Sequence, residues 1–224
     1  MKKLVYALIF ALILVSASAF AETAYVTITT GDGIIAVAHE AFEVIDSDGD
    51  GVLSISDALY AAHENAYEGG AEAGYLSEDL GYGLSLSKLW GEENGGSYGY
   101  YLNNASAMSL LDPIADGDHV KAYAYMDLTA WSDTYCYFDA DTAEIAAGNA
   151  LDLTLTALVF DANWNPVATP VEGAVITVNG AETEFVTNAD GAVSLNFDAA
   201  GEYIVSAASA SMTLVPPICI VTVS

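Results

Sequence analysis

The sequence predicts a mainly β protein with one main helix, in which a small α+β domain is followed by a β-sandwich. Residues 24–127 read in the order strand, strand, helix, strand, strand, which fits a small mixed sheet that clasps one helix. From about Asp139 onward the pattern changes to short alternating strands separated by turns such as NADG, which is typical of a sandwich. Aromatic and β-branched residues are plentiful, so a folded core is expected despite the high charge.

The first residues predict export. Lys2 and Lys3 precede the apolar run LVYALIFALILV, and small residues ending in Ala19-Phe20-Ala21 follow it. A basic head, a short apolar segment and an A-x-A site are the features of a secretory signal peptide. We expect residues 1–21 to be removed before Glu22, with an uncleaved anchor as the alternative. The protein is then secreted, either extracellular or held at a cell surface.

The charge beyond that segment is strongly acidic. Lys88 and Lys121 are the only basic side chains besides histidine there, against 31 acidic residues. Such a surface repels phosphates, so neither nucleic acid nor an anionic membrane is expected as a partner. No later stretch is typical of a membrane span, so no membrane insertion is expected. The charge attracts divalent cations, or it serves solubility alone.

Local patterns predict the elements of the first domain. AYVTITT, the turn GDG and IIAVAHEAFEVI form a predicted hairpin, and SDALYAAHENAY reads as a helix that ends at the glycines of EGG. Ser54 and Asp57 form a variant of a capping box. Residues 68–99 are rich in Gly, Ser and Tyr, and we expect long loops there with few regular elements. The positions expected to share one side of the helix are Ala58, Leu59, Ala62 and Ala66.

Two further segments carry a family resemblance. GSYGYYLNN (96–104) resembles a glycine, aromatic strand and Asn turn, and LLDPIADGDHVKAYAY (110–125) resembles a final DGD followed by a strand. Both are features of the β-grasp family named after the C-terminal domain of transcobalamin, which is common in secreted bacterial proteins. The resemblance covers about residues 24–127 and implies a β-grasp-like domain over residues 22–138.

The second predicted domain, residues 139–224, has its own resemblance. VEGAVITVNG (171–180) and TNADGAVSLNFDAAGEYIVSA (187–207) are similar to bacterial immunoglobulin-like and carboxypeptidase-regulatory-like modules. Such modules usually act as spacers or adhesive stalks, so the resemblance implies an immunoglobulin-like β-sandwich that carries the first domain.

The strongest chemical motif is DSDGDGVLSISD, residues 46–57. Its spacing is that of a calcium loop, because alternate carboxylates on a tight turn supply the six to eight oxygens that calcium requires. Gly51 permits the sharp turn, and Leu53 is expected to point into the core. The alternative is an acidic surface turn. The predicted ligands are Asp46, Asp48, Asp50, the carbonyl of Val52, Ser54 and Asp57.

Three roles are open to such a loop. A closing Asp resembles dockerin loops, but a dockerin carries two loops and one is present here, which argues against docking. A calcium sensor is not expected outside the cell, where calcium is plentiful and an affinity of ~10⁻⁴–10⁻³ M suffices. We therefore expect a structural clip that fastens the second strand to the helix.

Other possible sites are weaker. His39 and His63 both occur in AHE and could bind a transition metal, but half-buried, hydrogen-bonded histidines are favoured because the H-E-x-x-H pattern is absent. Ser97 lies in a G-x-S-x-G match, yet a loop before it and a strand after it do not fit a nucleophile elbow. Since no acid–base pair can be singled out, we expect a protein that is not an enzyme.

Aromatic residues suggest a recognition surface. They concentrate in the first domain and its exit, where their faces could stack on sugar rings, planar ligands or partner proteins; the alternative is core packing. We expect a binding protein for an extracellular small molecule or glycan, with a surface module that binds protein partners as the second hypothesis. The candidate ligand-binding residues are Trp90, Tyr98, Tyr100 and Tyr101.

The chain contains two cysteines that could form a disulfide. Cys136 lies at the domain junction and Cys219 in the last predicted strand, in a chain that enters an oxidising compartment. One disulfide between them is the natural expectation, with two buried free thiols as the alternative.

Overall fold

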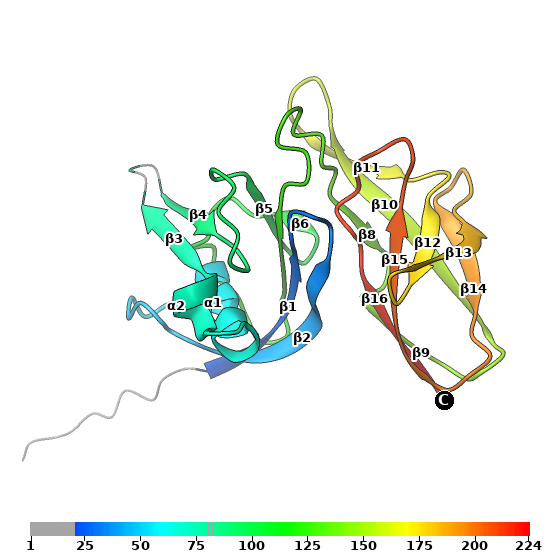
Figure 1. Cartoon of the computed structure of the whole chain (residues 1–224), viewed down its shortest axis with the longest axis horizontal. Coiled ribbons are helices and arrows are strands. Elements are labelled where there is room, and N and C mark those ends of the chain that lie inside the picture. Colours follow the sequence, from blue (N-terminus) through cyan, green and yellow to red (C-terminus); the bar gives the residue numbers. More distant parts are fainter. Residues whose placement is uncertain (1–20, 80, 82) are drawn as a thin grey trace, which may run out of the picture.

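The computed structural model describes residues 21–79, 81 and 83–224 (Figure 1). The predicted signal peptide, apart from Ala21, lies outside these residues. Strands hold 49% of the chain and helices 8%, which confirms the mainly β fold class. No helix among the described residues is long and apolar enough to cross a membrane.

The first half of the molecule, residues 21–125, is built on a five-stranded sheet. Its spatial order is β2 (Ile35–Ile45), β1 (Ala21–Thr29), β7 (His119–Ala124), β5 (Tyr98–Leu102) and β6 (Ala105–Ser106). The central pair β1 and β7 is parallel, while their other neighbours are antiparallel. Both faces of the sheet are covered, because all six residues of β7 are buried.

One face of this sheet packs against α1 (Ile55–Ala66). The N-cap Ser54 and Asp57 form the predicted capping box, with both reciprocal bonds present. Leu59 is fully buried in the same apolar cluster as Ile28 of β1 and Val120 of β7. The predicted helix face is confirmed at Ala58, Leu59 and Ala62, whereas Ala66 is exposed because the helix ends there.

The segment 68–99 is more regular than expected. It forms the short helix α2 (Gly70–Gly74) and a separate hairpin of β3 (Leu76–Asp79) and β4 (Leu84–Lys88). Leu86 and Leu89 are buried in the cluster beneath α1. Elements this short are stabilised by tertiary packing rather than by propensity, so local composition could not reveal them.

The second half, residues 136–224, consists of two sheets (Figure 1). The strands of one are β11 (Pro166–Pro170), β10 (Ala150–Phe160) and β14 (Ala192–Asn196), and β8 (Cys136–Phe138) also pairs with β10. The other has the order β13 (Ala181–Val186), β12 (Val175–Val178), β15 (Gly201–Ala208), β16 (Cys219–Val223) and β9 (Thr142–Ile145). Their inward side chains, such as Leu155, Ile176 and Val221, form one apolar cluster.

The expected disulfide is not formed. Cys136 on β8 and Cys219 on β16 are both free and buried, and they belong to the apolar cluster of the second half. The Cys136 thiol instead donates to the carbonyl of Val215, 3.2 Å away. Burial raises the pKa of the Cys219 thiol to about 12, and burial also raises that of Cys136. Both cysteines therefore serve here as small packing residues.

A tyrosine cluster joins the two halves. Tyr101 and Tyr123 project from the first sheet and meet Tyr135 and Val215 of the following chain. The rings of Tyr101 and Tyr135 stack with centroids 3.5 Å apart and planes inclined by 7°. The Tyr123 ring also lies over Gly99, where any side chain would collide with it. The second face of the first sheet is thus the surface that contacts the second half.

Candidate functional site

The acidic loop lies where the chain leaves β2 and enters α1. Carboxylate oxygens of Asp46, Asp48 and Asp50 lie within 4.8 Å of one another. Gly49 and Gly51 have φ values of 79° and 88°, a left-handed conformation that glycine adopts without steric cost. Their N–H groups donate to the two oxygens of Asp46 at 2.7 and 2.9 Å. The loop backbone therefore orients the first of the three carboxylates.

The like charges of this loop affect one another. The hydrogen bond from Gly51 N–H is the largest influence on Asp46 and lowers its pKa. For Asp48, the hydrogen bond from Asp50 N–H lowers the pKa, but desolvation and the charges of Asp50 and Asp57 outweigh it, so the pKa is raised. A bound cation would relieve this repulsion.

Asp57 closes the loop through hydrogen bonds. Its Oδ1 accepts from Ser47 N and Oγ at 2.8 and 2.6 Å, and its Oδ2 accepts from Ser54 N and Oγ at 3.0 and 2.7 Å. Asp57 lies outside the group of three aspartates. Ser54 is buried with it, whereas Val52 is 45% exposed. The oxygen donors suit a hard cation such as calcium, provided that Ser54 and Asp57 exchange these bonds for the ion.

The exit of the loop is held by a second segment. Leu53 is buried as predicted, and its carbonyl accepts from Ile114 N at 2.9 Å. Ile55 N and Ser56 N donate to the carbonyls of Asp112 and Leu110. Ser54 also forms an isolated bridge with Pro113. The backbone at the loop exit is therefore already ordered by the protein itself.

The four candidate ligand-binding aromatics do not share one surface. Tyr101 is buried in the stack with Tyr135. Trp90, Tyr98 and Tyr100 are partly buried against the core beneath α1. The Trp90 ring packs against His63 and Tyr67.

A groove of about 380 Å³ forms beside Tyr98. Its lining residues, which we call the aromatic groove, are Gly96, Ser97, Tyr98, Tyr125 and Trp131. Tyr98 Oη lies 2.8 Å from the carbonyl of Glu92 and accepts from Asn94 N. Tyr125 N donates to Ser97 O at 3.0 Å, which ties two walls together. Trp131 is 65% exposed at the open side.

The loop that carries Trp131 is braced by two aspartates. Asp127 accepts from Thr129 N, Ala130 N and Ser132 Oγ. Asp133 accepts from the N–H groups of Met126 and Asp127. The N–H of Ala130, the hydroxyl of Ser132 and the N–H of Thr129 lower the pKa of Asp127 to about 2. The indole is therefore presented by an ordered loop.

The two histidines considered as a metal pair are separate. His63 is fully buried; its Nδ1 pairs with Leu59 O at 2.6 Å and its Nε2 accepts from Trp90 N at 2.9 Å. Burial lowers the pKa of His63 to about 4. Both ring nitrogens are thus used within the protein, which makes His63 a structural residue. His39 lies elsewhere, stacked on Tyr25 at 4.4 Å.

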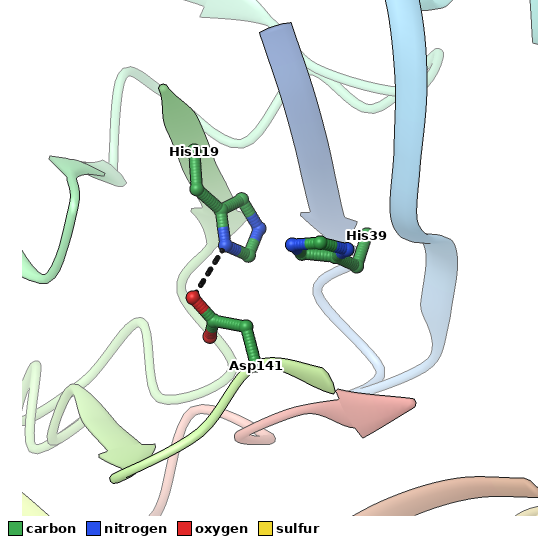
Figure 2. Close-up of side chains that lie close together, drawn as sticks. All are labelled: His39, His119 and Asp141. Atoms are coloured by element: carbon green, nitrogen blue, oxygen red, sulfur yellow. Dashed lines mark hydrogen bonds and ion pairs between the residues drawn. The ribbon is translucent and has the colours of Figure 1, made fainter. Parts of the chain in front are cut away.

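His39 belongs to a polar cluster that the sequence did not reveal (Figure 2). His119 of β7 lies edge-on to His39, and its Nδ1 is 3.0 Å from Asp141 Oδ2. Its Nε2 is 2.8 Å from Thr27 Oγ1. Asp141 Oδ1 accepts from Lys121 Nζ at 2.7 Å. Burial lowers the pKa of His119 to about 4, against the opposing effect of Asp141.

This cluster is a hydrogen-bonded network rather than a metal centre. Three of its groups, His39, His119 and Asp141, lie close enough to share an ion. However, both nitrogens of His119 and both oxygens of Asp141 already have protein partners. The ammonium of Lys121 is also 2.7 Å from Asp141 Oδ1, and its positive charge would repel a cation bound to that carboxylate.

Ser97 has no hydrolase geometry. It leads directly into β5, whereas a nucleophile elbow requires a helix after the serine. Its N–H donates to Asn94 Oδ1, and its carbonyl accepts from Asn94 Nδ2 and Tyr125 N. Ser97 therefore helps to shape the aromatic groove.

Several residues that matter were not singled out from the sequence as site residues. Tyr125 and Trp131 follow β7, and only folding brings them beside residues 96–98. His119 and Lys121 of β7 meet Asp141, which immediately precedes β9, through side-chain hydrogen bonds between the two halves. One feature of the sequence could have indicated this cluster. His119 and Lys121 alternate with apolar residues of β7, which places both on the sheet face opposite α1.

No protein-family model matches the chain, and no curated protein matches it.

Proposed function

We propose that this chain is a secreted, calcium-stabilised, non-enzymatic binding protein whose aromatic groove takes an extracellular glycan or small molecule. The observation that carries this proposal is the groove itself. Tyr98, Tyr125 and Trp131 present aromatic surface around about 380 Å³ of space, and hydrogen bonds hold each wall in place. Aromatic faces stack on the apolar faces of sugar rings and on planar molecules.

The charge of the chain narrows the ligand class. The formal net charge is −27, and the groove contains no basic side chain among its lining residues. A polyanion would be repelled. The favoured ligands are therefore neutral or cationic, with hydroxyl groups that can hydrogen-bond to Ser97 and to the backbone beside Gly96.

Calcium has a structural role in this proposal. The acidic loop fastens β2 to α1, and its exit is bonded to residues 110–114. No residue of the acidic loop lines the aromatic groove, so in this proposal calcium stabilises the scaffold and does not contact the ligand. An affinity of ~10⁻⁴–10⁻³ M would saturate the site outside a cell.

The architecture proposed from the sequence fits this role. The central parallel pair β1 and β7, the hairpin into α1 and the mixed sheet support a β-grasp-like domain over residues 22–138 that resembles the transcobalamin-like family. The two packed sheets support an immunoglobulin-like sandwich over residues 139–224. In this proposal the sandwich carries the binding domain, and residues 1–21 direct export.

A thermal-shift screen with a fluorescence readout tests the ligand proposal. The mature protein, with Trp164→Phe so that Trp131 is the most exposed indole, is screened in calcium against neutral oligosaccharides and planar small molecules. We expect at least one compound to raise the melting temperature and to shield Trp131 from a soluble quencher. A compound that raises the melting temperature without shielding Trp131 places binding elsewhere, and the absence of any stabilising compound contradicts the proposal.

A second candidate function is adhesion to a protein partner. It is favoured by exposed apolar side chains on the hairpin of β10 and β11, which is an edge of its sheet. All five residues of β11 are exposed. The exposed large side chains of this hairpin are Val159, Phe160, Trp164 and Val167.

The two functions are distinguished by which variant loses binding. In pull-downs from cell-surface fractions, a Phe160→Ser, Trp164→Ser double variant would lose its partner if the hairpin is adhesive. Trp131→Ala would keep that partner. The reverse pattern would support the aromatic groove.

A further inference from the structure

Lys121 is a lysine in an unusual place. It lies in the middle of the central strand β7, opposite Tyr101 of β5, and is 7% exposed. Lysine is almost never buried unless it is paired. The Lys121 amine contacts two groups, Asp141 Oδ1 and Asn104 Oδ1, each at 2.7 Å.

Asn104 presents its carboxamide to this amine. Its Oδ1 accepts from Lys121 Nζ and from the hydroxyl of Tyr135, which is also 2.7 Å away. Two donors on one carbonyl oxygen draw electron density from the carbonyl carbon and stabilise negative charge on the oxygen. The carboxamide carbon is therefore activated and adjacent to a primary amine.

The turn that carries Asn104 is held by hydrogen bonds. Asn103 and Asn104 have φ values of 50° and 65° and form the two-residue connection between β5 and β6. Asn103 donates to Asp118 Oδ1 and accepts from His119 N. This clamp holds Asn104 over β7, so amine and carboxamide are positioned before any reaction.

We propose that Lys121 and Asn104 are joined by an intramolecular isopeptide bond that forms without a cofactor. Asp141 takes a proton from the Lys121 ammonium, and the nitrogen lone pair forms a bond to Cγ of Asn104. The carbonyl electron pair moves to Oδ1, where the Tyr135 hydroxyl stabilises it. Asp141 passes this proton to Nδ2, and the electron pair on Oδ1 re-forms the carbonyl as the Cγ–Nδ2 bond breaks. The nitrogen now bonded to Cγ gives its second proton, through Asp141, to the departing ammonia, which leaves as ammonium. A lysine ammonium and a primary amide become a secondary amide and an ammonium ion, with no change of oxidation state.

The surroundings favour the first proton transfer. Burial lowers the pKa of Lys121, although Asp141 opposes that effect. The charge of Lys121 is one of the influences that lower the pKa of Asp141. This influence disappears once the Lys121 amine is neutral, so Asp141 holds the transferred proton more readily. His119 positions the Asp141 carboxylate by bonding its Oδ2, which leaves Oδ1 for the amine. Tyr101, which lies opposite Lys121 in the sheet, stacks on Tyr135, whose hydroxyl donates to Asn104 Oδ1.

The intact mass of the folded mature protein tests the proposal directly. We expect it to be about 17 Da below the mass calculated from the sequence, because one ammonia is lost when the nucleophilic amine displaces it. Lys121→Met and Asn104→Ala should each show no such loss. Lys88→Met is the matched control, since it removes the other lysine of the described chain and should keep the loss.

Fragmentation locates the bond. A peptide that joins the segments around Asn104 and Lys121, together with resistance to trypsin after Lys121, supports the proposal. An intact mass equal to the calculated value overturns it, and so does a gain of about 1 Da from simple hydrolysis of the amide. These readouts come from the unsubstituted protein, so they do not depend on whether any variant folds.

The bond should also be visible in stability. It would close a chain segment in which the linked residues are 17 positions apart. Lys121→Met should therefore lower the melting temperature by about 10 °C. Asp141→Ala should show no ammonia loss, so its intact mass should equal the mass calculated from its sequence. An ammonia loss that persists in this variant would overturn the role of Asp141 in the reaction.

Discussion

The two halves of the molecule bury different kinds of side chain. Among the described residues, the buried Asp, His and Lys side chains are those of Asp57, His63, His119 and Lys121, and all four lie in the first half. The polar residues buried in the second half are Thr187 and Ser206, whose neutral hydroxyls are cheaper to desolvate. A buried carboxylate, imidazole or ammonium group requires a fixed hydrogen-bond or charge partner, so the first half carries specific polar geometry, whereas the second half depends on apolar packing.

The possible sites of the molecule lie in the first half or at its border with the second half. The acidic loop lies in the first half, the aromatic groove is formed by that half and the loop that leaves β7, and the Lys121 network lies where the two halves meet. The first half should respond to cations, pH and ligands. The second half should respond mainly to changes in its core.

The largest expected effects come from truncating each core. Leu59→Ala in α1 and Leu155→Ala in β10 remove fully buried side chains, one from each half. Each should lower the free energy of unfolding by about 2–5 kcal/mol. Hydrogen exchange measured on each variant separates the halves: Leu59→Ala should loosen residues around α1, and Leu155→Ala the sandwich. Equal loosening of both halves by either variant would contradict the comparison.

Acidification should weaken the first half through His63. Its folded pKa of about 4 lies below its ordinary value of 6.5, so the unfolded chain binds more protons between these values. Stability from this group is complete above pH 6.5 and is lost as the pH falls toward 4, by about 3 kcal/mol at most.

A matched variant isolates that contribution. His63→Gln, whose carbonyl can still accept from Trp90 N, should reduce the pH dependence of the unfolding free energy between pH 6.5 and 4 and leave the part that His119 contributes. Denaturant titrations across this range provide the measurement. A slope identical to that of the unsubstituted protein would show that His63 does not titrate on unfolding.

Calcium removal should have an effect of similar or smaller size. At a calcium concentration 100 times the dissociation constant, binding adds about 2.7 kcal/mol to the unfolding free energy. Chelation or Asp46→Ala should therefore lower the stability of the first half while the sandwich stays folded. Asp32→Ala, at the tip of the hairpin between β1 and β2, is a control that removes a carboxylate outside the loop. A melting curve unchanged by a chelator would refute the structural clip.

The sequence predicted local features of the first half well. The mainly β class, the capping box at Ser54 and Asp57 and the inward Leu53 are confirmed, because each follows from short-range spacing. The hairpin of β3 and β4 was missed because its short strands are stabilised by packing. The prediction of a disulfide between Cys136 and Cys219 was wrong, since an oxidising compartment and an even number of cysteines do not determine whether two thiols are bonded.

The candidate site was predicted only in part. The three aspartates of the acidic loop are brought together as their spacing indicated. Of the four candidate aromatics only Tyr98 lines the groove, because strand alternation turns Tyr101 toward the second half. Asp141 lies far along the chain from Lys121, and no periodicity in either segment reports their contact.

The smallest expected effects on stability belong to the two exposed tryptophans. Trp131 and Trp164 are 65% and 81% exposed, and both lie in loops at positive φ. Trp131→Ala and Trp164→Ala should each change the unfolding free energy by no more than about 0.5 kcal/mol. These two variants are therefore suited to a comparison of ligand binding, because neither should change the stability of the protein by more than that amount.

The binding affinity of this matched pair for a ligand that stabilises the protein tests the central claim most directly. Calorimetric titration in calcium should show that Trp131→Ala weakens binding at least about 5-fold, since loss of a stacking aromatic anchor costs more than about 1 kcal/mol. Trp164→Ala should bind as the unsubstituted protein does. Equal affinities for the Trp131→Ala variant and the unsubstituted protein, or a selective loss in Trp164→Ala, would contradict the assignment of binding to the aromatic groove.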